Sequence, residues 1–197
     1  MNRVLIGVHG KPRSGKDTLA THLVEKYKLL RYGPSMPVKV ATAAMFDIPI
    51  EYLYDDKMKD AFDAFWQMSY REMAQKVGKE SIRDIFVEDF WMRHTEKMWI
   101  EVQKGLPIID ILAEAHNTYN GMILADIRYA NEVTWVKDRG GIVIFVTREN
   151  RGYVANEQHA AEKGLDLALA DIIVPNNGTI EQLYSYTDLI VAPLIGA

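Results

Sequence analysis

The stretch GVHGKPRSGKDTLATHL, residues 7–23, decides the fold predicted for this chain. Gly10, Gly15 and Lys16 stand at the spacing of the phosphate-binding loop G-x-x-x-x-G-K-[ST]. Asp17, however, occupies the position at which that loop normally has Ser or Thr. The stretch is therefore a degraded motif, a coincidence, or a different version of the same loop.

The residues on either side of the loop favour a phosphate-binding function. The apolar run RVLIGVHG (3–10) ends in glycine, as a buried parallel strand would, and apolar residues at helical spacing follow from Asp17. A strand, a glycine-rich turn and then a helix form the setting that this motif requires. The alternative is a glycine turn that begins a helix and binds nothing.

The chemistry of such a loop assigns roles to its residues. Glycines let backbone N–H groups approach phosphate oxygens, and Lys16 would reach the β- and γ-phosphates of ATP. An aspartate after the lysine is chemically reasonable because Mg²⁺ prefers oxygen ligands; Thr18 offers a hydroxyl one residue later. We expect the ATP-binding residues to be Gly10, Lys11, Ser14, Gly15, Lys16, Asp17 and Thr18.

The rest of the chain alternates strands with helices. Further strands are predicted at 122–125, 141–149 and 170–176, and helices at 38–46, 130–138 and after Thr179, which would cap the last one. Residues 50–104 contain most of the aromatic residues and are predicted to form several helices with a break near Gly78. This order predicts an α/β fold, a mostly parallel sheet with helices on both faces.

Charged residues follow the predicted strands, at the edge where such folds bind ligands. Asp126 could orient Mg²⁺ and its waters, although a capping or salt-bridging role fits its position equally well. Arg148 and Arg151, in the lid-like segment 148–160, could close on phosphates, or they could belong to an exposed basic turn.

The segment YREMAQKVGKESIRDIFVEDFW, residues 70–91, carries a second group of polar residues. Arg71 and Gln75 share one helix face, and an arginine fork suits phosphate while a glutamine amide suits a base edge. The spacing alone favours an ordinary solvated helix face over a nucleotide site.

Bulk composition limits the classes of function. The 197 residues suit one domain, 1–197, and the net charge of −4 gives no reason to expect binding to nucleic acid or membranes. There is no cysteine, which excludes disulfides, thiolate metal sites and cysteine nucleophiles. No signal peptide or long apolar run is present, so we expect a cytoplasmic protein, in the host cytoplasm if a phage encodes it.

Seven motifs in order give the sequence a family resemblance. The chain resembles the deoxynucleoside monophosphate kinases of bacteriophages, within the P-loop kinase superfamily. The motifs are GKPRSGKDT, SMPVK (35–39), REMAQKVGKESIR, DFW (89–91), LADIRYANEV, HAAEKGL and VPNNGTIEQL. Lys79 and Ala130 depart from the family pattern, in which a small hydroxyl residue and proline are common.

The resemblance implies a three-layer P-loop kinase fold with a helical acceptor-binding insertion, which uses ATP and Mg²⁺ to phosphorylate a deoxynucleoside monophosphate. It implies catalytic roles for Lys16, Arg13, Arg148, Arg151 and Asp126. Substrate-binding roles would fall to Lys39, Arg71, Gln75, Gly78, Arg83, Trp91, Arg128 and Glu132. The residues that position Mg²⁺ would be Asp17, Thr18 and Asp126.

Two other functions compete with this interpretation. One is a P-loop kinase for another small metabolite, since phosphomevalonate kinases of one type have a similar loop. The other is a non-catalytic ATP-binding module of a larger assembly. The resemblance also implies a homodimer, and the aromatic residues of 50–104 could bury such an interface or form an ordinary core.

Overall fold

The structure is a computed structural model that describes residues 3–55, 57–110, 115–149 and 165–196. The chain divides into two compact units. The first, residues 1–32 with 98–197, is called the sheet unit, and the second, residues 33–97, is called the helical unit.

The sheet unit is built on a five-stranded sheet in which every neighbouring pair is parallel. The strand order is β2 (Leu29–Arg31), β7 (Gly121–Leu124), β1 (Val4–His9), β8 (Ile142–Thr147) and β9 (Ile172–Pro175). Four of these strands are those expected from apolar runs, whereas β2 is not. A separate antiparallel pair joins β5 (Ile108–Asp110) to β6 (Ala115–Asn117).

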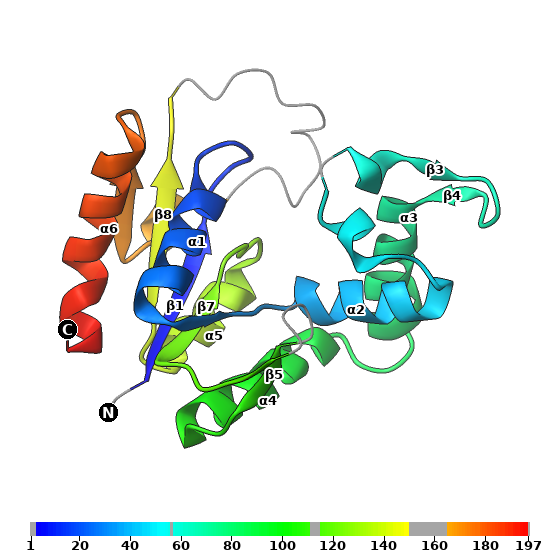
Figure 1. Cartoon of the computed structure of the whole chain (residues 1–197), viewed down its shortest axis with the longest axis horizontal. Helices are drawn as coiled ribbons and strands as arrows, with labels where there is room; N and C mark the ends of the chain where they lie inside the picture. The colour runs from blue at the N-terminus through cyan, green and yellow to red at the C-terminus, as the bar shows by residue number, and fades with distance from the viewer. Residues whose placement is uncertain (1–2, 56, 111–114, 150–164, 197) are drawn as a thin grey trace. The chain divides into compact units, whose positions relative to one another are not determined.

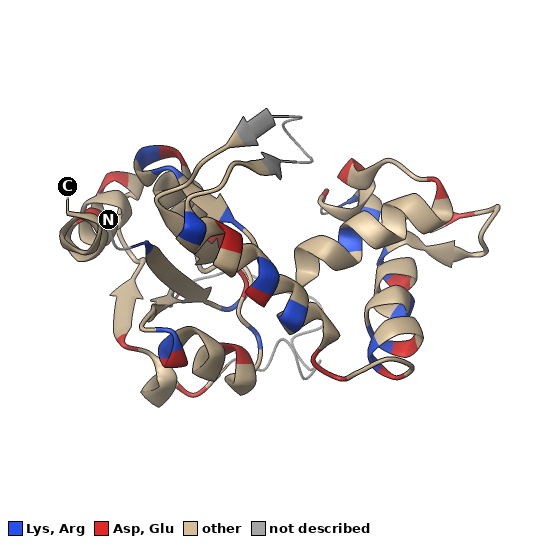
Figure 2. Cartoon of the chain, turned by 90° about the horizontal axis from the view of Figure 1, so that it is seen from below, with Lys and Arg blue, Asp and Glu red and all other residues tan. Residues whose placement is uncertain are grey.

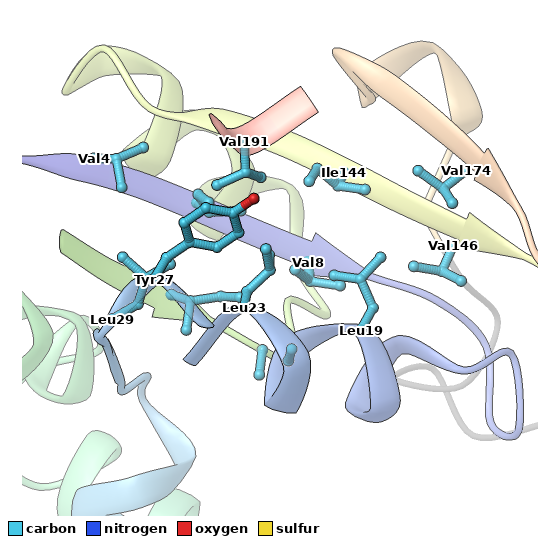
Figure 3. Packing of buried hydrophobic residues seen from close by; sticks show 14 of the residues in the cluster. Val4, Val8, Leu19, Leu23, Tyr27, Leu29, Ile144, Val146, Val174 and Val191 are labelled. Carbon is cyan, nitrogen blue, oxygen red and sulfur yellow. The ribbon is translucent and has the colours of Figure 1, made fainter. Parts of the chain in front are cut away.

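Helices cover both faces of this sheet (Figure 1). On one face, α1 (Lys16–Tyr27) and α6 (Ile180–Ile195) pack on alternate residues of the strands, including Ile6, Val8 and Ile144 (Figure 3). On the other face, α5 (Ala130–Asp138) and the last part of α4 (Phe90–Lys104) pack on the intervening residues, such as Phe145. The predicted α/β class is thus confirmed.

A polar cluster joins α1 to α6 at the edge of this core. The Asp188 carboxylate accepts hydrogen bonds from Tyr27 Oη (2.8 Å) and Lys26 Nζ (2.7 Å) and lies 2.9 Å from His22 Nε2. Burial first, and then the Asp188 carboxylate, raise the pKa of Tyr27 to about 12. Thr179 caps α6, as the sequence predicts, because its side chain accepts from Gln182 N.

The helical unit consists mainly of short helices around its own small core. In chain order it contains α2 (Ser35–Phe46), the 3-10 helices η1 (Ile50–Leu53) and η2 (Met58–Asp60), the hairpin of β3 (Phe62–Asp63) and β4 (Met68–Ser69), α3 (Tyr70–Gln75), the π-helix η3 (Lys76–Arg83) and the start of α4. The core is formed by Leu53, Tyr70 and Met73, with partly buried residues around them. A further 3-10 helix, η5 (Leu167–Leu169), belongs to the sheet unit.

The helical content expected at 50–104 is present, but two details differ. The β3–β4 hairpin interrupts the helices, and the predicted break near Gly78 is wrong because the chain there continues as the π-helix η3. A Cβ at Gly78 would lie 3.1 Å from Val38 Cγ1, so the glycine lets η3 approach α2 closely.

Basic and acidic residues occur together on some helices, such as α1 and α4, as Figure 2 shows. Over the described ranges, none of the helices has both the length and the apolar character needed to cross a membrane.

Candidate active site

The glycine-rich loop between β1 and α1 is held against the end of the sheet. Asn176, which follows β9, donates from Nδ2 to the backbone oxygen of Ser14 at 2.8 Å. Gly15 has a φ of +99°, and a Cβ there would lie 2.2 Å from the same Nδ2. A side chain at Gly15 would therefore strain the backbone and displace the amide that fixes the loop.

The start of α1 has the properties of an anion-binding site. The N-cap residue is Gly15, and no side chain of the described residues caps the helix. The N–H groups of its first turn are therefore left to an anion or water, and the helix dipole favours an anion. Gly10 keeps the loop tight, since a Cβ there would lie 2.3 Å from Ser14 Oγ and 2.9 Å from the Val146 carbonyl oxygen. The loop thus has the geometry to bind a phosphate group or another small anion.

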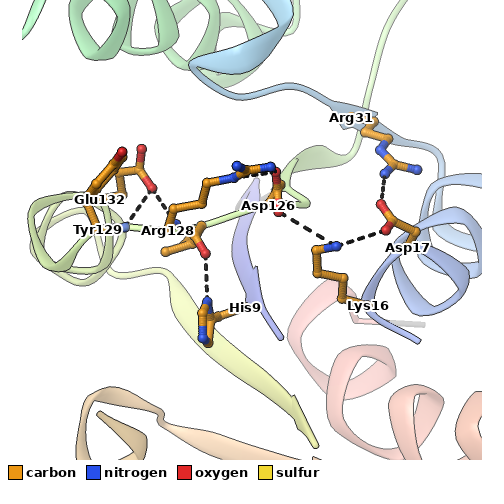
Figure 4. A network of polar contacts seen from close by, with 9 residues as sticks. His9, Lys16, Asp17, Arg31, Asp126, Arg128, Tyr129 and Glu132 are labelled. Atoms are coloured by element: carbon orange, nitrogen blue, oxygen red, sulfur yellow. Dashed lines mark hydrogen bonds and ion pairs between the residues drawn. The ribbon is translucent and has the colours of Figure 1, made fainter. Parts of the chain in front are cut away.

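Five alternating charges lie beside this helix start (Figure 4). Lys16 Nζ lies 3.0 Å from Asp17 Oδ2 and 3.7 Å from Asp126 Oδ1. On one side, Arg31 Nη2 donates to Asp17 Oδ1 at 2.6 Å. On the other, Arg128 donates from Nε and Nη2 to Asp126 Oδ2 at 2.8 and 2.5 Å. The lysine is therefore flanked by two carboxylates, each of which has its own arginine.

These contacts keep Asp17 ionised. Burial acts to raise the pKa of Asp17, but Lys16 and then Arg31 outweigh that effect and hold the pKa below its usual value. Asp17 therefore carries a negative charge at neutral pH, beside the place where a phosphate loop receives an anion. The Arg31 guanidinium partly offsets that charge.

Sequence reasoning did not identify Arg31 as a site residue. Arg31 ends β2, a strand of three residues, which is too short to show a pattern in the sequence. Its partner is 14 residues away in the chain. The available signal was the unusual Asp17 itself, because an extra carboxylate in an anion site requires a nearby cation.

Glu132 has a structural role in the turn after β7. Its Oε2 accepts hydrogen bonds from the backbone N–H groups of Arg128 (2.7 Å) and Tyr129 (3.2 Å) at the start of α5. Burial raises the pKa of Glu132, and the two N–H bonds act against that rise. The carboxylate thus fixes the turn that carries Arg128.

The described residues contain no group of three or more His, Cys, Asp or Glu side chains that could hold a metal ion. A phosphate loop does not need one, because Mg²⁺ in nucleotide sites is held mainly by phosphates and water with one or two carboxylates. Asp17 and Asp126 lie on either side of Lys16 and supply suitable oxygens. Thr18, half-buried on α1, offers a hydroxyl.

In the helical unit, Gly78 and Trp91 are brought together. Trp91 is 7% exposed, and its Nε1–H donates to the Gly78 carbonyl oxygen at 2.7 Å. Arg83 is close by in sequence, but its Nε donates to the backbone oxygen of Glu88 at 3.0 Å. The indole therefore braces the π-helix that carries Gly78 and Arg83.

The remaining expected substrate residues have separate partners within the helical unit. Arg71 donates to both carboxylate oxygens of Asp60, at 2.5 and 3.1 Å, whereas Gln75 is exposed on the same helix. Lys39 Nζ lies 3.6 Å from the centre of the Tyr54 ring. Both arginine–carboxylate and lysine–aromatic contacts hold these cations in defined positions.

The other expected catalytic arginines lie on exposed turns. Arg13 is exposed within the phosphate loop and has a φ of +61°, and Lys11 beside it is also exposed. Arg148 is exposed immediately after β8. Arg151 lies outside the described residues, as does most of the lid-like segment expected at 148–160.

A family model and two viral relatives all match this chain under the same description. A family model described as deoxynucleotide monophosphate kinase matches residues 49–187. A putative deoxynucleotide monophosphate kinase of Acanthamoeba polyphaga mimivirus is 29% identical over 185 residues, covering 92% of this chain and 93% of the relative. The deoxynucleotide monophosphate kinase of Enterobacteria phage T4 is 23% identical, covering 92% and 95%.

The fold also has a relative among solved structures. The Thermus thermophilus protein TT1252 superposes with a TM-score of 0.51 at 16% identity, covering 98% of this chain and 99% of that protein. At this identity the similarity concerns the fold alone.

Proposed function

Because the chain belongs to the deoxynucleotide monophosphate kinase family, we propose that it transfers the γ-phosphoryl group of ATP to the 5′-phosphate of a deoxynucleoside monophosphate. The product is the corresponding diphosphate, a precursor for DNA synthesis. The names of the mimivirus and phage T4 relatives support this class of acceptor.

One observation carries the proposal. Lys16 lies at the uncapped start of α1, between two carboxylates that have arginine partners, at the end of a parallel sheet. When ATP binds, its phosphates would take the place of the carboxylates as partners of the Lys16 ammonium group. Asp17 and Asp126 would then retain Arg31 and Arg128, so neither of these two carboxylates would be left unpaired.

The main task of the protein in this reaction is to align the two nucleotides and offset their charge. ATP and a monophosphate together bring about six negative charges, and one bound Mg²⁺ would supply two positive charges. We assign the remaining compensation at the donor phosphates to Lys16 and Arg13, with Arg148 and Arg151 near the transferred group. The acceptor needs no general base because its phosphate is already largely ionised at neutral pH.

The helical unit would bind the acceptor. Arg71 and Arg83 are suited to its phosphate because a guanidinium can donate two parallel hydrogen bonds. Arg71 presents such a fork to Asp60 in this structure, which suggests the geometry in which it would meet a phosphate. Gln75 and Lys39 would contact the nucleoside. Trp91 would hold Gly78 in place through its hydrogen bond to the Gly78 carbonyl oxygen.

The two competing functions have less support. Neither a metabolite kinase of the phosphomevalonate type nor a non-catalytic ATP-binding module is favoured by the family match. A non-catalytic module would also have no need for the separate arginines of the helical unit.

The test is a panel of acceptors. The purified protein is given ATP and Mg²⁺ with each deoxynucleoside monophosphate, each ribonucleotide or phosphomevalonate, and ADP release is followed by a coupled assay. We expect ADP release that depends on at least one deoxynucleoside monophosphate and is lost in Lys16→Met. ADP release with phosphomevalonate as the only active acceptor would contradict the proposal. So would the absence of acceptor-dependent ADP release with every compound of the panel.

A further inference from the structure

His9 is a buried titratable residue for which the reaction gives no role. It ends β1 directly before Gly10, the first glycine of the phosphate loop, and is 7% exposed. The Phe145 ring packs against it, with 4.6 Å between ring centres. A histidine in such a site must satisfy both ring nitrogens within the protein.

The two ring nitrogens bind two different segments of the sheet unit. His9 Nδ1 lies 2.7 Å from the carbonyl oxygen of Ile127, and the N–H of Leu165 donates to Nε2 at 3.1 Å. A carbonyl can only accept and a backbone N–H can only donate. The ring must therefore be neutral, with its proton on Nδ1.

The electrostatic surroundings agree with this assignment. Burial, the largest effect, lowers the pKa of His9 below its usual value, and Lys16 and Lys11 act in the same direction. The hydrogen bond to Ile127 and the charge of Asp126 act against that shift. The imidazole is therefore neutral at neutral pH, as the two hydrogen bonds require.

Ile127, the residue that His9 holds, separates two residues of the proposed active site. Asp126 precedes it and Arg128 follows it. The N–H of Ile127 also donates to the Val8 oxygen at 3.0 Å, so two consecutive residues of β1 bind its backbone. Figure 4 shows the His9 ring below this turn, with Asp126 and Arg128 beyond it towards Lys16.

We propose that His9 is a positioning residue, whose Nδ1–H fixes the turn of Asp126, Ile127 and Arg128 against the start of the phosphate loop. The bond sets where the Asp126 carboxylate and the Arg128 guanidinium stand relative to Lys16. This inference rests on the proposed function, because it assigns His9 to the same active site.

Two amide substitutions separate the contacts of His9. The asparagine amide nitrogen lies near the position of Nδ1 and can donate to Ile127, whereas glutamine reaches the position of Nε2 and can accept from Leu165. We expect His9→Asn to keep kcat within about threefold of the wild type. We expect His9→Gln and His9→Ala to lower kcat about tenfold or more, with the KM for ATP changed less than about twofold, because small displacements of reacting groups are costly.

Hydrogen exchange at the Ile127 amide gives a readout that does not depend on activity. We expect exchange to be about tenfold faster in His9→Gln and His9→Ala than in the wild type or His9→Asn. The control is Val191→Ala, which opens a cavity under α6 in the core on the opposite face of the sheet from Ile127 and Phe145, and should lower stability without changing kcat or the exchange of this amide.

Three results would overturn the role of His9: retention of kcat by glutamine but not asparagine, equal kcat in all three variants, or unchanged Ile127 exchange in His9→Gln and His9→Ala. A wild-type protein that transfers no phosphoryl group would instead refute the proposed function. The exchange measurement would still decide whether His9 fixes the turn.

Discussion

Replacement of Arg31 tests why this loop can have an aspartate after its lysine. Without Arg31, Lys16 is the one ion-pair partner that the Asp17 carboxylate keeps among the described residues, and Asp17 competes with ATP for that lysine. It also repels the incoming phosphates. We therefore expect Arg31→Gln to weaken ATP binding and to leave the fold intact.

The size of the expected effect on ATP binding follows from the exposure of the Arg31–Asp17 ion pair. Arg31 Nη2 and Asp17 Oδ1 are 2.6 Å apart, but the two side chains are 42% and 62% exposed, so solvent screens them. Exposed ion pairs contribute up to about 1 kcal/mol, which corresponds to about fivefold in an equilibrium constant. The KM for ATP in Arg31→Gln should thus rise about fivefold, and the rise should shrink at high salt.

The assay is a double-mutant cycle on the KM for ATP, measured by ADP release at saturating acceptor. If Arg31 acts through Asp17, Arg31→Gln should have less than about a twofold effect when Asp17→Asn is already present. A full fivefold effect in the Asp17→Asn background would show that Arg31 acts on another group and not through Asp17.

A Mg²⁺ titration of Asp17→Asn tests the proposed metal role of Asp17 separately. An unchanged Mg²⁺ requirement would exclude that role.

Three further predictions follow from other contacts. Gly15→Ala should lower the melting temperature and raise the KM for ATP, because its Cβ would lie 2.2 Å from Asn176 Nδ2; unchanged values would argue against a fixed loop. The contribution of Tyr27 to the free energy of unfolding should be fully present below about pH 10, the usual Tyr pKa, and should be lost as the pH rises through about 12, where folded Tyr27 ionises. Tyr27→Phe should remove this pH-dependent contribution from alkaline unfolding curves. Arg71→Ala should raise the KM for the monophosphate more than that for ATP, and the reverse order would count against an acceptor site.

The main features of the fold follow from local sequence patterns. Four apolar runs predict β1, β7, β8 and β9, and the bounds of α5 agree with the predicted 130–138. β2 escapes prediction because three residues cannot show alternation, and the same holds for the two-residue strands of the β3–β4 hairpin.

Gly78 shows a second limit of sequence reasoning. A glycine in a helical pattern usually indicates a break, yet here it allows η3 to approach Val38 of α2. Close packing between two helices depends on tertiary contacts, which local propensity does not encode.

The candidate site was predictable where it follows a motif and not where it depends on tertiary pairing. Gly10, Gly15 and Lys16 follow from spacing. The contacts of Arg31 with Asp17 and of His9 with Ile127 join residues that only the strand order brings together. Glu132, expected to bind substrate, holds the backbone of α5 in this structure, a capping role that its position near the start of that helix could have suggested.

The most direct test of phosphoryl transfer to a deoxynucleoside monophosphate is to follow the γ-phosphoryl group itself. ATP labelled at the γ-phosphate is incubated with the protein, Mg²⁺ and a mixture of deoxynucleoside monophosphates, and the products are separated. We expect the label to appear in a deoxynucleoside diphosphate with the wild type and not with Lys16→Met. Label found only in inorganic phosphate, or only in unreacted ATP, would contradict the proposed phosphoryl transfer.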